Sequence, residues 1–149
     1  NTTTSPQVES ESSFTVTLKT NGEVWTYGQN TYGELGLGDL SSYDESHKVT
    51  FNNDSENEVK IKQIAVGEYH VAALDIDGNV WTWGRNNNYQ IGHTGGDQYV
   101  PYRVTGLPKV IKIAAGNNNT MVITEDNELY GWGFNSYGDL GIGSFANKV

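Results

Sequence analysis

Short apolar runs recur along the chain. Each is followed by a tight turn and then by a second run in which apolar and polar residues alternate. The middle copy reads HVAALDIDGNVWTWG over residues 70–84. Alternation with a period of two is typical of strands that bury one face. Asn-Gly or Asp-Gly between two such runs favours a β-hairpin because these residues tolerate positive φ. The pattern therefore predicts hairpins at Asn21-Gly22, Asp77-Gly78 and Asp126-Asn127, where Asn replaces Gly in the last.

These hairpins belong to a longer repeat. Its aromatic-x-aromatic-Gly motif ends at Gly28, Gly84 and Gly133, which lie 56 and 49 residues apart. The same offsets align the first aromatic residues (Trp25, Trp81 and Tyr130), the second (Tyr27, Trp83 and Trp132) and the apolar residues of a Gly-rich loop (Leu35, Ile91 and Leu140). A further strand is expected at Tyr99–Val104. About four strands in each ~50 residues form the unit of a β-propeller blade, so we predict an all-β fold of four-stranded antiparallel blades.

The repeat also suggests boundaries. Residues 1–13 are expected to form a polar N-terminal lead-in or a degenerate strand, because only Val8 is apolar in the stretch VESE. The repeats then cover 14–58, 59–107 and 108–149. The extra residues of the first spacing fall in FNNDSENE (51–58), which is predicted to be a loop. The two aromatic residues of each motif are two positions apart, so they share one face of their strand. We expect that face to pack on a neighbouring blade.

Composition narrows the possible partners. The chain has 9 basic and 18 acidic residues and a formal charge of −9, which argues against nucleic acid and favours a basic or neutral protein partner. The absence of Cys excludes disulfides and Cys-ligated zinc. No apolar run approaches the roughly 20 residues of a membrane span.

The sequence offers little catalytic chemistry. It has no nucleophile elbow and no P-loop. His70 aligns with Phe14 and Asn119, which indicates a packing role. The stretch DIDGN (75–79) resembles the start of a calcium loop, but Asn86 stands where an EF-hand requires Glu. We therefore expect no enzyme activity, no catalytic residue, no metal site and no cofactor.

Three stretches carry a family resemblance: G-x-x-H-x-x-A-L at Gly67–Leu74, D-G-x-V-x-x-W-G-x-N at Asp77–Asn86, and the loop Gly33–Gly38. They resemble the regulator of chromosome condensation repeat. The resemblance implies a seven-bladed β-propeller, of which about two and a half repeats are present here. It thus implies a partial propeller, or part of a ring closed by further chain or by partner subunits.

The resemblance also indicates a binding face. In this family the residues between the Gly and His positions lie on a face that contacts protein partners, and they correspond here to Glu68, Tyr69, Asn117 and Asn118. The leading hypothesis is a non-enzymatic protein-binding or structural module of a secreted or cell-surface microbial protein. An extracellular or cell-surface location is expected, with a cytoplasmic one left open. The alternatives are a guanine-nucleotide exchange factor for a small GTPase and an enzyme inhibitor of the β-lactamase-inhibitor type.

Overall fold

The computed structural model describes residues 6–11, 13–51, 58–93 and 95–134, and these residues form three antiparallel sheets. Blade 1 contains β1 (Gln7–Glu11), β2 (Phe14–Leu18), β3 (Val24–Gly28) and β4 (Tyr43–Lys48). Blade 2 contains β5 (Ile61–Val66), β6 (His70–Asp75), β7 (Val80–Gly84) and β8 (Gln98–Arg103). Blade 3 contains β9 (Val110–Ala115), β10 (Asn119–Thr124) and β11 (Leu129–Gly133).

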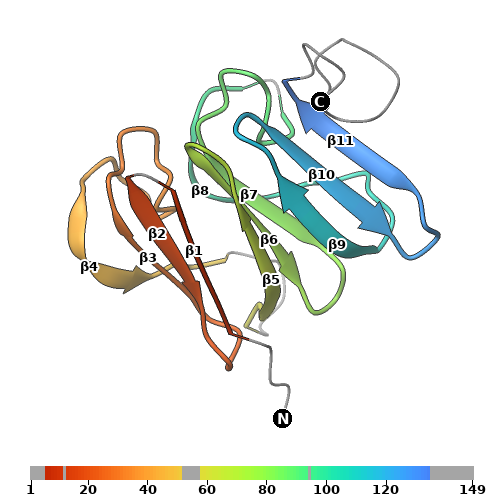
Figure 1. The fold of residues 1–149 in the computed structure, drawn as a ribbon, viewed down its shortest axis with the longest axis horizontal. Helices are drawn as coiled ribbons and strands as arrows, with labels where there is room; N and C mark the ends of the chain where they lie inside the picture. Colours follow the sequence, from red (N-terminus) through yellow and green to blue (C-terminus); the bar gives the residue numbers. More distant parts are fainter. Residues whose placement is uncertain (1–5, 12, 52–57, 94, 135–149) are drawn as a thin grey trace.

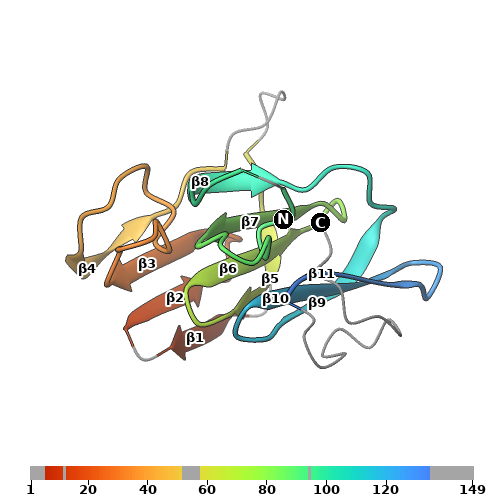
Figure 2. The same cartoon turned by 90° about the horizontal axis from the view of Figure 1, so that it is seen from above.

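Each sheet is paired in chain order, and the three sheets stand side by side in sequence order (Figure 1). Seen from above, each sheet turns relative to the one before it, as blades of a propeller do (Figure 2). The predicted all-β fold of antiparallel blades is confirmed. The strand expected at Tyr99–Val104 is present as β8, one residue earlier.

Two strands have little apolar character. β1 lies within the stretch 1–13 and pairs with β2 from Gln7↔Leu18 to Glu11↔Phe14. β4, with the sequence YDESHK, was not expected, and it pairs with β3 through Trp25↔Lys48. Of the predicted loop over 51–58, only Phe51 and Glu58 are described, and both lie outside strands. The remainder of that prediction concerns residues outside the described part of the chain.

The core lies between the blades. Alternate residues of β6 pack against different blades. Val71 and Ala73 pack towards blade 1, while Ala72 and Leu74 pack towards blade 3. This follows from the two-residue period of a strand whose faces are both covered. The blade 1–2 core also contains Phe14, Val16, Leu18, Trp81 and Trp83, and the blade 2–3 core contains Val80, Val110, Ile113, Val122 and Trp132.

The repeated aromatic residues face the preceding blade. Trp83 Nε1 donates to Glu34 O at 2.9 Å, and Trp132 Nε1 donates to Gln90 O at 2.9 Å, so each indole is bonded to the Gly-rich loop of the blade before it. The expected packing of the aromatic pair on a neighbour is confirmed for blades 2 and 3. In blade 1 Tyr27 is 38% exposed, and no described residues form a blade on that side, so the packing of this face stays a prediction.

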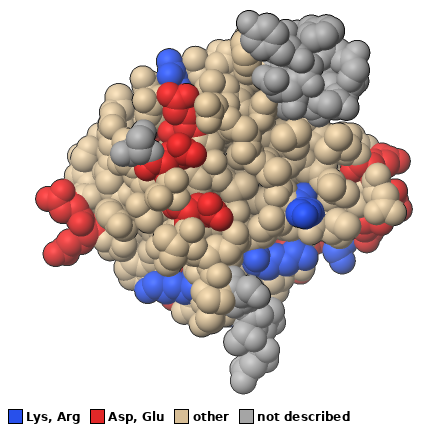
Figure 3. Space-filling view, in the orientation of Figure 1, with Lys and Arg blue, Asp and Glu red and all other residues tan. Residues whose placement is uncertain are grey.

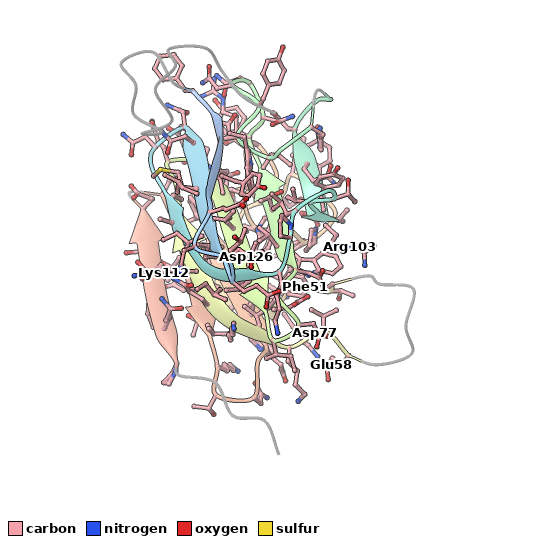
Figure 4. The ribbon with its side chains drawn as sticks, turned by 90° about the vertical axis from the view of Figure 1, so that its right-hand side faces the viewer. Phe51, Glu58, Asp77, Arg103, Lys112 and Asp126 are labelled. Carbon is pink, nitrogen blue, oxygen red and sulfur yellow. The ribbon has the colours of Figure 1, made fainter. Side chains whose placement is uncertain are left out.

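The hairpin turns form as predicted. Gly22 and Gly78 have φ values of 86° and 90°, and Asn127 takes the same left-handed conformation at 64°. These turns lie at one end of the strands. Figure 4 labels Asp77 in the second of these turns and Asp126 in the third. No helix in the described part of the chain is long and apolar enough to cross a membrane.

Candidate protein-binding face

Two turns at the opposite end of the strands carry the residues predicted to bind a partner. Each is closed by a backbone hydrogen bond, from Gly67 N to His70 O at 2.8 Å and from Gly116 N to Asn119 O at 3.1 Å. Glu68 N donates to Asn117 O at 3.0 Å and so ties the turn of blade 2 to the turn of blade 3. The structure therefore brings Glu68 and Asn117 together.

Tyr69 joins two residues that the sequence did not suggest. Its ring centroid lies 4.9 Å from that of Tyr32, at an interplanar angle of 58°. The Arg85 guanidinium carbon lies 4.5 Å from the centroid of Tyr32 and 5.7 Å from that of Tyr69. We call Tyr32, Tyr69 and Arg85 the loop-face cluster. It spans the junction of blades 1 and 2, and its side chains are all half-buried.

A repeated backbone contact holds this cluster in place. Arg85 N donates to Tyr69 O at 2.9 Å, just after Gly84, whose φ is 109°. A Cβ on Gly84 would collide with Tyr69 O, so glycine is required for this close approach. The same contact recurs from Gln29 N to Ser13 O in blade 1 and from Phe134 N to Asn118 O in blade 3.

The two predicted asparagines differ in exposure. Asn117 is exposed, and its backbone oxygen accepts the bond from Glu68. Asn118 is half-buried, and its backbone oxygen accepts the bond from Phe134 at 2.9 Å. Glu68 is also half-buried. Of the four predicted residues, Tyr69 is the one that belongs to the loop-face cluster.

Glu34 supports the loop that presents Tyr32. Its Oε1 accepts from Tyr32 N at 2.8 Å, whereas Oε2 is buried without a hydrogen-bond partner. Burial raises the pKa of this carboxyl group above its usual value. Gln90 occupies the equivalent place in blade 2, where its Oε1 accepts from Asn88 N at 2.8 Å. The loop geometry is therefore repeated in these two blades, with an ionisable side chain in blade 1 and an amide in blade 2.

His70 lies beneath the turns and is fully buried. Its Nε2 is 3.1 Å from both Asn119 O and Thr120 Oγ1, and its Nδ1 has no partner. Burial lowers the pKa of this imidazole from 6.5 to about 4, with a smaller opposing effect from Asn119 O. His70 is therefore neutral at pH 7 and packs between blades 2 and 3, which confirms its predicted packing role.

One face of the molecule shows how its charged side chains are distributed. Figure 3 shows a mostly uncharged face with acidic side chains scattered over it and basic ones mainly in its lower half. Among the described residues, no three His, Asp or Glu side chains are grouped so that they could hold a metal ion.

Arg85 and Tyr32 were not predicted as binding residues, and the alignment of the repeats explains why. Alignment of the repeats pairs Arg85 with Gln29 and Phe134, so that position looked variable. It pairs Tyr32 with Asn88 and Tyr137, so Tyr32 belonged to the repeat pattern but was not assigned to the binding face. For Arg85 the signal was a cationic side chain where the other repeats have Gln or Phe, and for Tyr32 it was an aromatic residue in two of the three repeats.

Comparison with known proteins agrees with this architecture. The model of the regulator of chromosome condensation (RCC1) repeat matches residues 21–74 and 77–123. A second model with the same description matches residues 61–90 and 110–139. The chain is 35% identical over 130 residues to the ultraviolet-B receptor UVR8 of Arabidopsis thaliana, covering 85% of this chain and 29% of the receptor. It is 34% identical over 131 residues to the human E3 ubiquitin-protein ligase HERC2, covering 85% of this chain and 3% of the ligase.

Solved structures show the same fold. Yeast RCC1 (Prp20) bound to Kap60 superimposes with a TM-score of 0.82 at 19% identity, covering 95% of this chain and 35% of that one. Human WBSCR16 superimposes with a TM-score of 0.77 at 24% identity, covering 87% and 33%. The chain thus spans about a third of these propellers, and less of the curated relatives.

Proposed function

The chain belongs to the regulator of chromosome condensation repeat family, and from this premise we propose that it is a non-enzymatic protein-binding module whose partner docks on the loop face. The observation that carries the proposal is the loop-face cluster. Tyr and Arg are enriched among the residues that dominate binding energy at protein interfaces. Here both lie in a preorganised group at the junction of two blades.

The surroundings of the cluster support a protein partner. The stack of Arg85 on Tyr32 restricts both side chains before binding, which reduces the entropy lost on association. Glu68 lies on the same turn as Tyr69 and adds an acidic group, which suits a partner of basic or neutral charge. The yeast protein of the same fold was solved with Kap60, and its crystal structure was described with binding to Gsp1p and histones, so that relative binds proteins.

We propose a second kind of contact at the two ends of the blade stack. Blade 1 presents Trp25 and Tyr27 on its outer face, and blade 3 presents Ile111, Ile123 and Leu129. These faces are equivalent to ones that are buried between blades, so further blades of the same or another chain would cover them. Light scattering after size exclusion tests this. A discrete multimer supports it, whereas a 16.4 kDa monomer that unfolds cooperatively contradicts it.

The cellular setting is also a proposal. An acidic, Cys-free chain with a Ser- and Thr-rich start is consistent with an extracellular or cell-surface protein. Fractionation of the source cells with an antibody to the chain tests the location. Recovery with the cytosolic markers alone would contradict it.

The loop face is tested with a matched pair of variants. Tyr69→Ala combined with Arg85→Ala removes the cluster, and Glu125→Ala alters an exposed residue of the β10–β11 turn at the other end of the sheets. In a cross-linking experiment with extract of the source cells, we expect the wild type and Glu125→Ala to capture the same proteins and the double variant to lose them. Equal capture by all three would overturn the loop face as the binding site.

The proteins captured in this experiment also distinguish between the alternative functions. If small GTPases are captured, addition of the chain should accelerate nucleotide release from them, as an exchange factor does. No acceleration excludes that activity. Inhibition of a β-lactamase panel tests the inhibitor alternative in the same way.

A further inference from the structure

Phe51 closes the junction between blades 1 and 2. Its ring lies edge-on to both indoles of blade 2, with centroids 5.5 Å from Trp81 and 5.6 Å from Trp83. Leu37 packs against the same core.

Gly106 holds the position of Phe51 in the next blade. Val49 N donates to Val24 O at 2.8 Å, and Val104 N donates to Val80 O at 2.9 Å, so the chain leaves β4 and β8 in the same register. Phe51 and Gly106 are each two residues further along.

The second apolar residue of the junction is replaced as well. His93 follows Gly92 as Leu37 follows Gly36. The His93 ring packs edge-on to Tyr102 with centroids 4.8 Å apart, and its Nδ1 accepts from Gly95 N at 2.9 Å. The ring is thereby held within the loop of its own blade.

A cavity of about 310 Å³ lies at this place between blades 2 and 3. Its walls include Gly92, Val104, Gly106, Leu107, Tyr130 and Trp132, and we call it the junction pocket. A Cβ on Gly106 would have no heavy atom within 4 Å. The indole nitrogen of Trp132 is bonded to Gln90 O, and the Tyr130 hydroxyl donates to Glu128 Oε2 at 2.9 Å, so both polar groups are already paired.

We propose that the junction pocket accepts a single aromatic side chain of a partner protein, in the way that Phe51 occupies the preceding junction. The pocket is large enough, because an apolar cavity of about 150 Å³ already binds benzene. Its two aromatic walls favour the edge-on packing seen around Phe51. Val104 and Gly106 lie at the strand end opposite to Tyr69, and no residue of the loop-face cluster lines the pocket, so either site can fail alone.

Titration of the 149-residue chain with N-acetyl-phenylalaninamide tests the proposal, with the tryptophan indole N–H signals observed by NMR. We expect a saturable shift of the Trp132 signal, assigned with Trp132→Phe, and a Kd on the order of millimolar for so small a probe. N-acetyl-leucinamide should bind at least about fivefold more weakly, because it lacks a ring to pack edge-on. No saturable shift of Trp132 up to the solubility limit of the probe overturns the proposal.

Variants locate the site. Leu107→Phe fills the pocket and Thr105→Phe obstructs its mouth, so each should abolish the shift of the Trp132 signal. Thr105 is exposed, so its variant remains usable if Leu107→Phe does not fold. Leu129→Ser removes an exposed apolar side chain from the other face of blade 3 and should leave the titration unchanged. Loss of binding in Leu129→Ser, with retention in both pocket variants, would assign the probe to the outer face and overturn the proposal.

Two further measurements test the equivalence of the two junctions and whether the bound aromatic ring can belong to a peptide. Phe51→Ala should open the corresponding gap at the preceding junction and add a second saturable shift, at Trp81 and Trp83. The peptide Ac-Gly-Phe-Gly-NH2 should bind at least as tightly as the single-residue probe. Loss of binding on extension at both ends would show a pocket for small molecules only, and would overturn a protein side chain as the occupant.

Discussion

The aromatic motif of blade 1 and that of blade 2 are nearly the same sequence in different surroundings. Trp81 and Trp83 are 2% and 0% exposed, whereas Trp25 is half-buried and Tyr27 is 38% exposed. The difference is the neighbour. The Gly-rich loop of blade 1 covers Trp83, while no described residues form a preceding blade beside Tyr27. A propeller repeat thus encodes a surface for the blade before it, and its contribution to stability depends on that blade being present.

The largest expected effect is at Trp83. Trp83→Ala removes a fully buried indole and its bond to Glu34 O, so we expect a loss of about 3–5 kcal/mol in the free energy of unfolding. Tyr27→Ala, at the equivalent position of blade 1, should cost less than about 1 kcal/mol. Urea denaturation of both variants measures the difference. Equal losses would contradict the dependence on a neighbouring blade.

A second large effect concerns pH. His70 has a folded pKa of about 4 against 6.5 when unfolded, so the unfolded chain binds the extra proton between these values. The stability associated with neutral His70 is full above pH 6.5 and falls as the pH drops towards 4. At about 1.4 kcal/mol for each unit of pKa difference, the loss is roughly 3 kcal/mol.

The repeat itself indicates which residue can replace His70. Asn119 occupies the position of His70 in blade 3, where its Oδ1 accepts from Gly116 N at 2.9 Å. His70→Asn should therefore flatten the stability profile between pH 4 and 6.5, as followed by denaturant titration at several pH values. A variant with an unchanged slope would show that other groups cause the pH dependence.

A smaller effect, of opposite sign, is expected at Glu34. Glu34→Gln introduces the residue found at the equivalent Gln90 and removes a buried carboxylate oxygen that has no partner. We expect a gain of about 1 kcal/mol at pH 7. Because burial raises the pKa of Glu34 in the folded chain, the wild type loses stability as the pH rises through that pKa. The advantage of Glu34→Gln should thus disappear below pH 4.5. An advantage that persists there would have another cause.

The same comparison explains how far the sequence could predict the structure. Period-two alternation and the Asn-Gly and Asp-Gly turns predicted the hairpins, because the two strands of a hairpin are neighbours in the sequence and the turn between them has a recognisable composition. β4 was missed because YDESHK has no apolar alternation, and the strand forms by pairing with β3 at the edge of its sheet. The loop-face cluster was missed because Tyr32 and Tyr69 meet across two blades. Alignment of repeats shows equivalent positions within blades and gives no contacts between them.

The smallest effect contrasts the hairpin turns. Gly22 and Gly78 take the left-handed conformation without strain, and Asn127 takes it in blade 3 with φ 64°. Asn127→Gly should therefore stabilise the chain by about 0.5 kcal/mol, since Asn tolerates this region less well than Gly. The reverse exchange at Gly78 should cost more than this gain, because a Cβ there would collide with Lys109 of the next blade. Thermal unfolding of Asn127→Gly and Gly78→Asn measures both, and changes of equal size would show that conformation alone, without the neighbouring blade, sets the preference for glycine.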